Sequence, residues 1–222
     1  MAIIYDTTMN PGKLDLLAAW LPGRPWYVAT GQAPVPVKAG GFRLDDPEGE
    51  VGIEFMVVTD TSGGRQVAYH VPVTYRGAPL EGAAAGLIGT SEHGVLGRRW
   101  VYDAAHDPVF VDRLLALFRG DAKPQHQSAS DTPEPGVAVR YEGPQVAGVP
   151  ATELPEVTED ARGTEILLPG GARLGLTRTP AEAADAPSGV LAQWMTPDGA
   201  THRGVFASLS FGPPARDADA GA

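Results

Sequence analysis

Residues 52–76 read GIEFMVVTDTSGGRQVAYHVPVTYR, and this stretch decides the fold class. Its first half has apolar side chains at every second position, at Ile53, Phe55 and Val57. Apolar or aromatic residues recur in the same way from Val67 to Tyr75, and Ser-Gly-Gly separates the two runs. A period of two places alternate side chains on opposite faces of a strand, and glycine permits a tight turn. The stretch therefore predicts a hairpin in a half-buried antiparallel sheet.

The second run also has a polar face. His70, Thr74 and Arg76 alternate with its apolar side chains. Because an antiparallel sheet with one packed face turns its other face toward solvent, we expect His70 at the surface or at an interface.

Composition and charge narrow the class of protein. The 222 residues, 43% of them hydrophobic, suffice to bury a core, and 28 glycines with 21 prolines favour a turn-rich sheet over a helical bundle. A net charge of −10 argues against nucleic acid or an anionic membrane as a partner. The absence of cysteine excludes disulfides, cysteine-ligated metals and a thiol nucleophile. No signal-peptide pattern or membrane-length apolar run occurs, so a cytoplasmic location is expected.

Two helices are expected to pack on the sheet. Asn10-Pro11 precedes an apolar face in residues 13–21, where Asn would cap the helix and Pro would occupy its first position. Asp107-Pro108 repeats this pattern before a second helix, which should end at Gly120. Further strands are expected at residues 2–5, 37–44 and 95–102.

The chain changes character after residue 121. Residues 122–136 are polar, contain prolines and lack periodicity, as is typical of a linker. Beyond them lie only strand patterns, at residues 137–141, 165–168, 173–177, 190–195 and 202–211. The expected organisation is an α+β domain at 1–121, the linker, a small all-β segment at 137–211 and a disordered tail at 212–222. The fold class is α+β: a curved antiparallel sheet packed by two helices, then an all-β segment that packs on it or is joined by the linker.

The sequence lacks the motifs of common catalytic sites. It has no kinase catalytic loop and no nucleophile elbow, and Gly40-Gly41 and Gly170-Gly171 are isolated pairs, not a phosphate-binding loop. Acidic and histidine residues gather between Glu92 and Asp107 without the spacing of metal ligands. The acidic stretch at 45–50 is interpreted as a solvated turn. No catalytic residue, metal site or cofactor is therefore predicted.

Three runs carry a resemblance to a known family: GGFRLDDPEGEVGIEFMVVTD at 40–60, AYHVPVTYRGAPLEG at 68–82 and IGTSEHGVLGRRWVYDAAHDP at 88–108. In order and character, residues 1–120 resemble the N-terminal cap domain of actinobacterial maltokinases and related glucosamine kinases. The resemblance implies a cystatin-like outline and a link to glycogen, trehalose or maltose-1-phosphate metabolism. Because the chain after Gly120 is too short for the kinase lobes, no catalytic residue of the family can be transferred.

Two functional hypotheses follow. The first is a non-catalytic cap-like accessory protein that binds or modulates a kinase or another enzyme of carbohydrate metabolism. The alternative is a carbohydrate-binding module or glucan-active enzyme, whose sugar ligand would lie on an aromatic and arginine cluster formed by Trp26, Tyr27, Arg98, Arg99, Trp100 and Tyr102. Packing of the aromatic rings between sheet and helix is the favoured interpretation of the same residues. Exposed strand edges would also allow pairing into a homodimer.

Overall fold

The computed structural model describes residues 8–144, 146–150, 152–186 and 188–212. The strand expected at residues 2–5 lies outside the described residues, as does the expected tail from residue 213 onward. Within the described ranges, no helix is long and apolar enough to cross a membrane.

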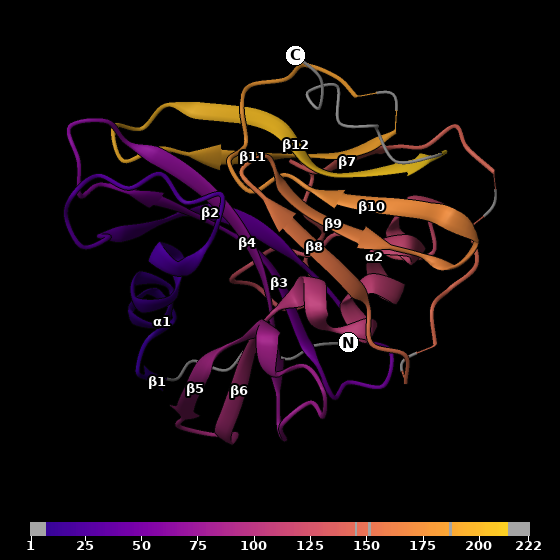
Figure 1. Ribbon diagram of the computed structural model, residues 1–222, viewed down its shortest axis with the longest axis horizontal. Coiled ribbons are helices and arrows are strands. Elements are labelled where there is room, and N and C mark those ends of the chain that lie inside the picture. The colour runs from indigo at the N-terminus through magenta and orange to yellow at the C-terminus, as the bar shows by residue number, and fades with distance from the viewer. Residues whose placement is uncertain (1–7, 145, 151, 187, 213–222) are drawn as a thin grey trace, which may run out of the picture.

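One antiparallel sheet of twelve strands organises the described part of the chain (Figure 1). The strands are β1 (Met9–Asn10), β2 (Pro36–Leu44), β3 (Gly52–Asp60), β4 (Val67–Arg76), β5 (Leu87–His93), β6 (Gly97–Asp103), β7 (Ala138–Arg140), β8 (Glu156–Asp160), β9 (Gly163–Leu167), β10 (Ala172–Leu176), β11 (Gly189–Met195) and β12 (Thr201–Phe211). Their order is β1-β5-β6-β4-β3-β2-β11-β12-β10-β9-β8, and β7 pairs with β11. Together with two α-helices, α1 (Lys13–Trp20) and α2 (Pro108–Arg119), the sheet confirms the predicted α+β class.

The hairpin at residues 52–76 forms as predicted, but it is not half-buried. β3 and β4 pair along their length, with Phe55 opposite Pro72. Side chains cover both faces of this pair. Leu17 and Trp20 of α1 cover one face, while α2 and the strands β9–β12 cover the other. The central strands therefore lie between two apolar clusters.

His70 is fully buried, so its expected place at the surface is wrong. Its ring lies between those of Phe55 and Phe206, at centroid distances of 5.9 and 4.3 Å. Phe206 belongs to β12, which comes far later in the chain. Alternation within β4 cannot show that a strand so much later in the chain packs over His70.

The second helix begins and ends as predicted. The carboxylate of Asp107 accepts a hydrogen bond from the Val109 N–H (3.0 Å), and Gly120 follows the helix with a φ of 81°. The same carboxylate also accepts bonds from Thr74 Oγ1 (2.8 Å) and from the guanidinium of Arg76 (2.7 Å). The cap residue thus fixes α2 to β4.

The first helix begins two residues later than predicted. Gly12 is its cap residue, and its N–H donates to the carboxylate of Asp15 (3.0 Å). Asn10 instead pairs with Glu92 of β5 in the sheet. The expected cap at Asn10 is therefore wrong, because a carboxylate inside the first turn supplies the capping bond.

The two halves of the chain meet at a narrow seam between β2 and β11. Among the described residues, Trp194 and Gly40 are the single pair that joins these strands, whereas β2 and β3 pair over almost their whole length. Residues 122–136 run beside β2, where Gln125 exchanges two backbone hydrogen bonds with Arg43 (2.9 Å each). The larger apolar cluster crosses the seam, since it contains residues of β2, β3, α2 and β9–β12.

Candidate functional site

Trp26 and Tyr27, two of the predicted site residues, pack on the α1 side of the sheet. The ring of Trp26 is buried, 5.7 Å from that of Trp20 and 5.9 Å from that of Tyr69. Tyr27 is half-buried against Tyr69 at 5.6 Å, and its hydroxyl donates to Asp60 (3.1 Å). These contacts match the packing interpretation of the two rings.

The other four predicted site residues lie on β6. Arg98 is exposed, Arg99 and Trp100 are half-buried, and Tyr102 is buried with its hydroxyl accepting a hydrogen bond from the Leu80 N–H (2.8 Å). Alternation along the strand places Arg99 on the opposite face from the other three. The four residues therefore do not form one surface.

The two predicted groups lie at different ends of β4. Tyr27 contacts Tyr69 near the start of that strand, whereas Trp100 pairs with Arg76 at its end. The seven intervening residue steps correspond to roughly 23 Å of extended strand. The structure does not bring all six residues around one sugar, and binding at either group remains a prediction.

A buried arginine joins the two halves of the chain. Arg178, which follows β10, is fully buried, and its Nη2 donates to both carboxylate oxygens of Asp103 (2.8 and 2.6 Å). Its Nε donates to Thr164 Oγ1 (2.7 Å), and the guanidinium lies 5.1 Å from the ring centroid of Trp26. The Trp26 Nε1–H in turn donates to Glu159 of β8 (3.0 Å). Removing one partner of such a buried pair would leave an uncompensated charge. The network therefore stabilises the packing of the later strands on the earlier part of the chain.

The arginine also faces a neutral histidine. His70 Nδ1 donates to the Thr177 carbonyl (3.0 Å), and the His70 backbone N–H donates to the Arg178 carbonyl (2.9 Å). Burial, and then the charge of Arg178, lower the pKa of His70 to about 3. Within the described chain, neither His70 Nε2 nor Arg178 Nη1 has a hydrogen-bond partner. The pair is a buried structural contact and not an acid–base centre open to a substrate.

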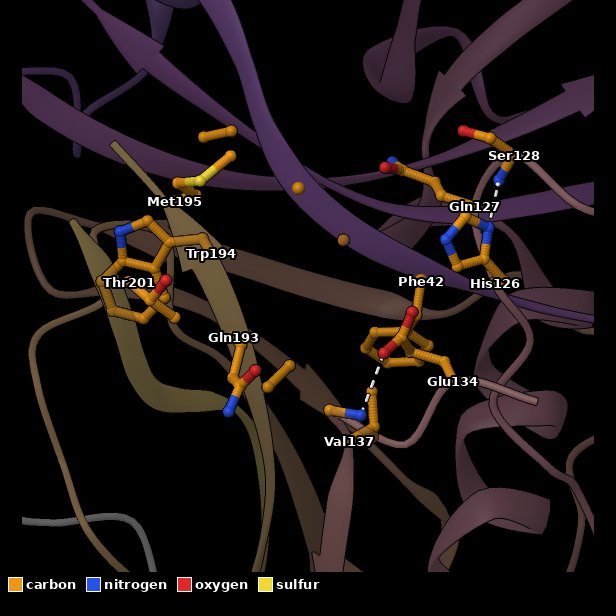
Figure 2. Close-up of a pocket in the computed structure, with 15 residues that line it drawn as sticks. Phe42, His126, Gln127, Ser128, Glu134, Val137, Gln193, Trp194, Met195 and Thr201 are labelled. Atoms are coloured by element: carbon orange, nitrogen blue, oxygen red, sulfur yellow. Dashed lines mark hydrogen bonds between the residues drawn. The ribbon is translucent and has the colours of Figure 1, made fainter. Parts of the chain in front are cut away.

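An open cavity of about 340 Å³ lies at the seam, between β2, β11 and residues 126–137. Figure 2 shows Trp194, Met195 and Thr201 on one side of it and His126, Gln127 and Ser128 on the other. None of the six residues predicted from the sequence to bind a sugar lines this cavity.

Two consecutive glycines shape the wall of the cavity on β2. The pairing of β2 with β3 shifts between Lys38 and Gly40, and Gly40 and Gly41 have φ angles of 137° and 128°. A Cβ on Gly41 would lie 1.9 Å from the Phe55 carbonyl oxygen and 3.0 Å from Gln127 Nε2. In the sequence this pair was interpreted as isolated glycines that do not form a phosphate-binding loop. Glycine inside a strand pattern is, however, also a signal of a bulge or of close backbone approach.

On the wall of the cavity formed by residues 126–128, Gln127 is hydrogen-bonded to the buried carboxylate of Glu54. Gln127 Nε2 donates to Glu54 Oε1 (2.7 Å), while Lys13 Nζ and the Tyr75 hydroxyl both donate to Glu54 Oε2 (2.6 Å). Burial alone would raise the pKa of Glu54, but the charge of Lys13 and the hydrogen bonds from Lys13 and Tyr75 outweigh it and lower the pKa. The wall is thus fixed by groups from α1, β3 and β4.

The cavity offers hydrogen-bonding groups but no cation. The side chains of Gln193, Ser128 and Thr201 make no hydrogen bond to any described residue, and Glu134 Oε1 accepts one from a backbone N–H (2.9 Å). No Arg or Lys is among the lining residues. The described residues also contain no group of three or more His, Asp or Glu that could hold a metal ion. Such a lining suits uncharged hydroxyl groups better than a phosphate.

Comparison with known proteins bears on the first half of the chain. Residues 20–107 match the family model of the maltokinase N-terminal cap domain. Over these residues, the match confirms the resemblance to this cap domain that the sequence indicated. The matched range holds β2–β6 and ends at Asp107, whereas residues 126–137 and β11 of the cavity lie beyond it. No curated protein matches the chain.

Proposed function

We propose that the chain is a non-catalytic cap-like accessory protein that binds or modulates a kinase or another enzyme of carbohydrate metabolism. The observation that carries this proposal is the cap match over residues 20–107. It occurs in a chain whose sequence has no phosphate-binding loop and no kinase catalytic loop. Glycogen, trehalose or maltose-1-phosphate metabolism is the proposed context, and the cytoplasm is the proposed location.

A cystatin-like outline belongs to the same proposal. The packing of α1 on one face of β3 and β4 supports it. The strands β9–β12, which cover the opposite face, would be an addition to that outline.

The hairpin of β5 and β6 supports the proposal as a contact surface for the partner. Val95 and Leu96 at its turn are exposed apolar residues, and Arg98 and Arg99 follow them along the chain. Figure 1 shows this hairpin projecting from the lower end of the sheet, away from β11 and β12. Arginine beside apolar side chains is common where proteins bind one another. We assign the hairpin tip, residues 93–99, as the partner contact.

An activity assay tests the non-catalytic part of the proposal. Purified full-length chain is incubated with ATP and either maltose or glucosamine, and ADP formation is measured. We expect no ADP above the rate without protein, because the phosphate-binding and catalytic loops of a kinase are missing from the sequence. Sugar-dependent ATP hydrolysis would overturn the non-catalytic assignment.

Capture from native lysate tests the partner. We expect the immobilised full-length chain to enrich an enzyme of carbohydrate metabolism, and Leu96→Asp to abolish that enrichment because it places a charge in an apolar contact. Val28→Asp is the matched control, since Val28 (51% exposed) is also an exposed apolar residue but lies outside the hairpin. Capture that is unchanged by Leu96→Asp, or that lacks any such enzyme, would contradict the proposal.

A further inference from the structure

We propose that the cavity between β2, β11 and residues 126–137 binds one or two units of a neutral sugar. This inference goes beyond the cap-like role and does not depend on it. The volume of about 340 Å³ lies at the lower end of the range for small-molecule sites, about 300–1,000 Å³. The cavity is open to solvent, so the occupant is a small sugar or the end of a longer chain.

The cavity supplies partners for hydroxyl groups, which both donate and accept hydrogen bonds. The amide of Gln193 and the hydroxyls of Ser128 and Thr201 bind no described residue and are free for a ligand. Glu134 uses Oε1 for a backbone N–H, which leaves Oε2 as an acceptor. His126 Nδ1 accepts the N–H of Ser128 (3.0 Å), so the neutral ring carries its proton on Nε2 as a donor.

Apolar groups line the cavity on the side opposite His126 and Ser128. Met195 of β11 is more than half exposed (56%), and the neighbouring Trp194, itself buried, is also among the residues that line the cavity. The indole is stacked on His202 at a centroid distance of 5.4 Å, which holds it in place. Figure 2 shows Met195 and Trp194 across the cavity from His126. A sugar ring between Met195 and His126 would place C–H groups against Met195 and hydroxyls within reach of the polar side chains around it.

Charge decides between a neutral sugar and a sugar phosphate. No Arg or Lys lines the cavity, and Glu134 contributes a carboxylate. A phosphate entering here would lose hydration without gaining the charge-assisted hydrogen bonds that normally hold it. The net charge of −10 adds long-range repulsion to any anion. The neutral sugar is therefore the favoured ligand.

The cavity walls are in place before a ligand arrives. Gln127 is bound to the buried Glu54, and the close approach of Gly41 to Phe55 fixes the path of β2. A site that is already ordered loses little conformational entropy on binding. Few contacts from exposed side chains would then suffice for measurable affinity.

Calorimetric titration of the full chain with maltose, glucose and glucose 1-phosphate tests the proposal. We expect at least one neutral sugar to bind with a Kd of about 1 mM or below, and glucose 1-phosphate to bind at least about tenfold more weakly. Gln193→Ala and Thr201→Ala should each weaken neutral-sugar binding about fivefold, because each removes one hydrogen bond. Gln66→Ala is the matched control, since Gln66 is an exposed amide in the turn between β3 and β4.

The outcomes separate clearly. Flat titrations with both neutral sugars up to about 10 mM, tenfold above the expected Kd, would overturn the proposal. Equal or tighter binding of glucose 1-phosphate would overturn the choice of a neutral ligand, and an affinity unchanged in both cavity variants would overturn the site. All three variants alter exposed side chains, and circular dichroism checks that they fold. Because lysate capture uses the hairpin tip, its result can fail or succeed independently of this one.

Discussion

At the scale of single residues, His70 is an ionisable group kept neutral inside the sheet. Burial and the charge of Arg178 lower its pKa to about 3, whereas a histidine in an unfolded chain titrates near 6.5. Between these values the unfolded chain binds a proton that the folded chain does not. The free energy of unfolding therefore falls as the pH falls from about 6.5 to about 3, by an amount on the order of 5 kcal/mol. Above pH 6.5 this loss is absent.

We predict that His70→Phe flattens the dependence of stability on pH. Phenylalanine keeps the ring contacts with Phe55 and Phe206 but removes the titrating nitrogen. At pH 7 the variant should be less stable by about 1–3 kcal/mol, because the Thr177 carbonyl loses its donor. Between pH 6.5 and 3 its stability should decline less than that of the wild type. Urea denaturation at pH 7, 5.5 and 4 measures both effects, and parallel pH profiles would contradict the prediction. His126→Phe, at an exposed histidine, is the matched control.

We also predict that Arg178→Met destabilises the fold strongly. Asp103 would stay buried without its cation, a change that costs about 3–5 kcal/mol. Arg98→Met is the matched control, because Arg98 pairs with Glu92 (2.8 Å) where both side chains are largely exposed. That pair should contribute less than about 1 kcal/mol. Guanidinium denaturation compares the two variants, and losses of similar size would show that burial of the Arg178 pair does not matter.

At the scale of elements, the bulge in β2 depends on Gly41. We predict that Gly41→Ala lowers the free energy of unfolding by at least about 3 kcal/mol, since its Cβ would collide with the Phe55 carbonyl at a strained φ. Gly49→Ala tests strain alone, because Gly49 also has a positive φ (73°) but nothing lies within 4 Å of its Cβ. It should cost about 1–2 kcal/mol. Equal losses in denaturation would rule out the close approach as the cause.

The elements that could be predicted are those whose decisive bonds are local. Asp107 caps α2 through a residue two positions away, and Gly120 ends it, so the sequence pattern was sufficient. At α1 two local signals competed, and the carboxylate of Asp15 decided the start against Asn10. The cavity could not be predicted, because its walls come from β2, residues 126–137 and β11. The two glycines marked an irregular strand but did not identify the segment across from it.

At the scale of the whole molecule, the same distinction explains why the sheet was expected to be half-buried. Alternation in β3 and β4 assigned side chains correctly to two faces. It could not show that β9–β12 cover the second face, since that depends on contacts between distant parts of the chain. The predicted limits at residues 121 and 137 follow changes in composition, and they stay predictions as domain boundaries. The apolar cluster extends across both limits.

This shared cluster leads to a prediction about folding. Residues 1–121 alone would expose the cover-facing side of Phe42 and Phe55, which pack in one cluster with Phe206 of β12 and Ile166 of β9. Leaving side chains of this size uncovered costs about 1.5–3 kcal/mol each, and a domain is stable by only about 5–15 kcal/mol in total. We therefore expect the full chain to unfold in one transition, and the fragment 1–121 to lack a cooperative transition in thermal denaturation followed by near-ultraviolet circular dichroism.

Co-expression separates loss of cover from damage caused by the cut. The fragments 1–121 and 122–222 produced together should associate and recover the cooperative transition, because the cut falls after α2 and leaves both sides of the cluster intact. The fragment 1–121 produced with an unrelated protein should not recover it. If 1–121 alone unfolded cooperatively at the temperature of the full chain, the cap would be an independent folding unit. The boundary at residue 121 would then be a true domain limit, and the later strands would stabilise the cap far less than their contacts with His70 and Asp103 imply.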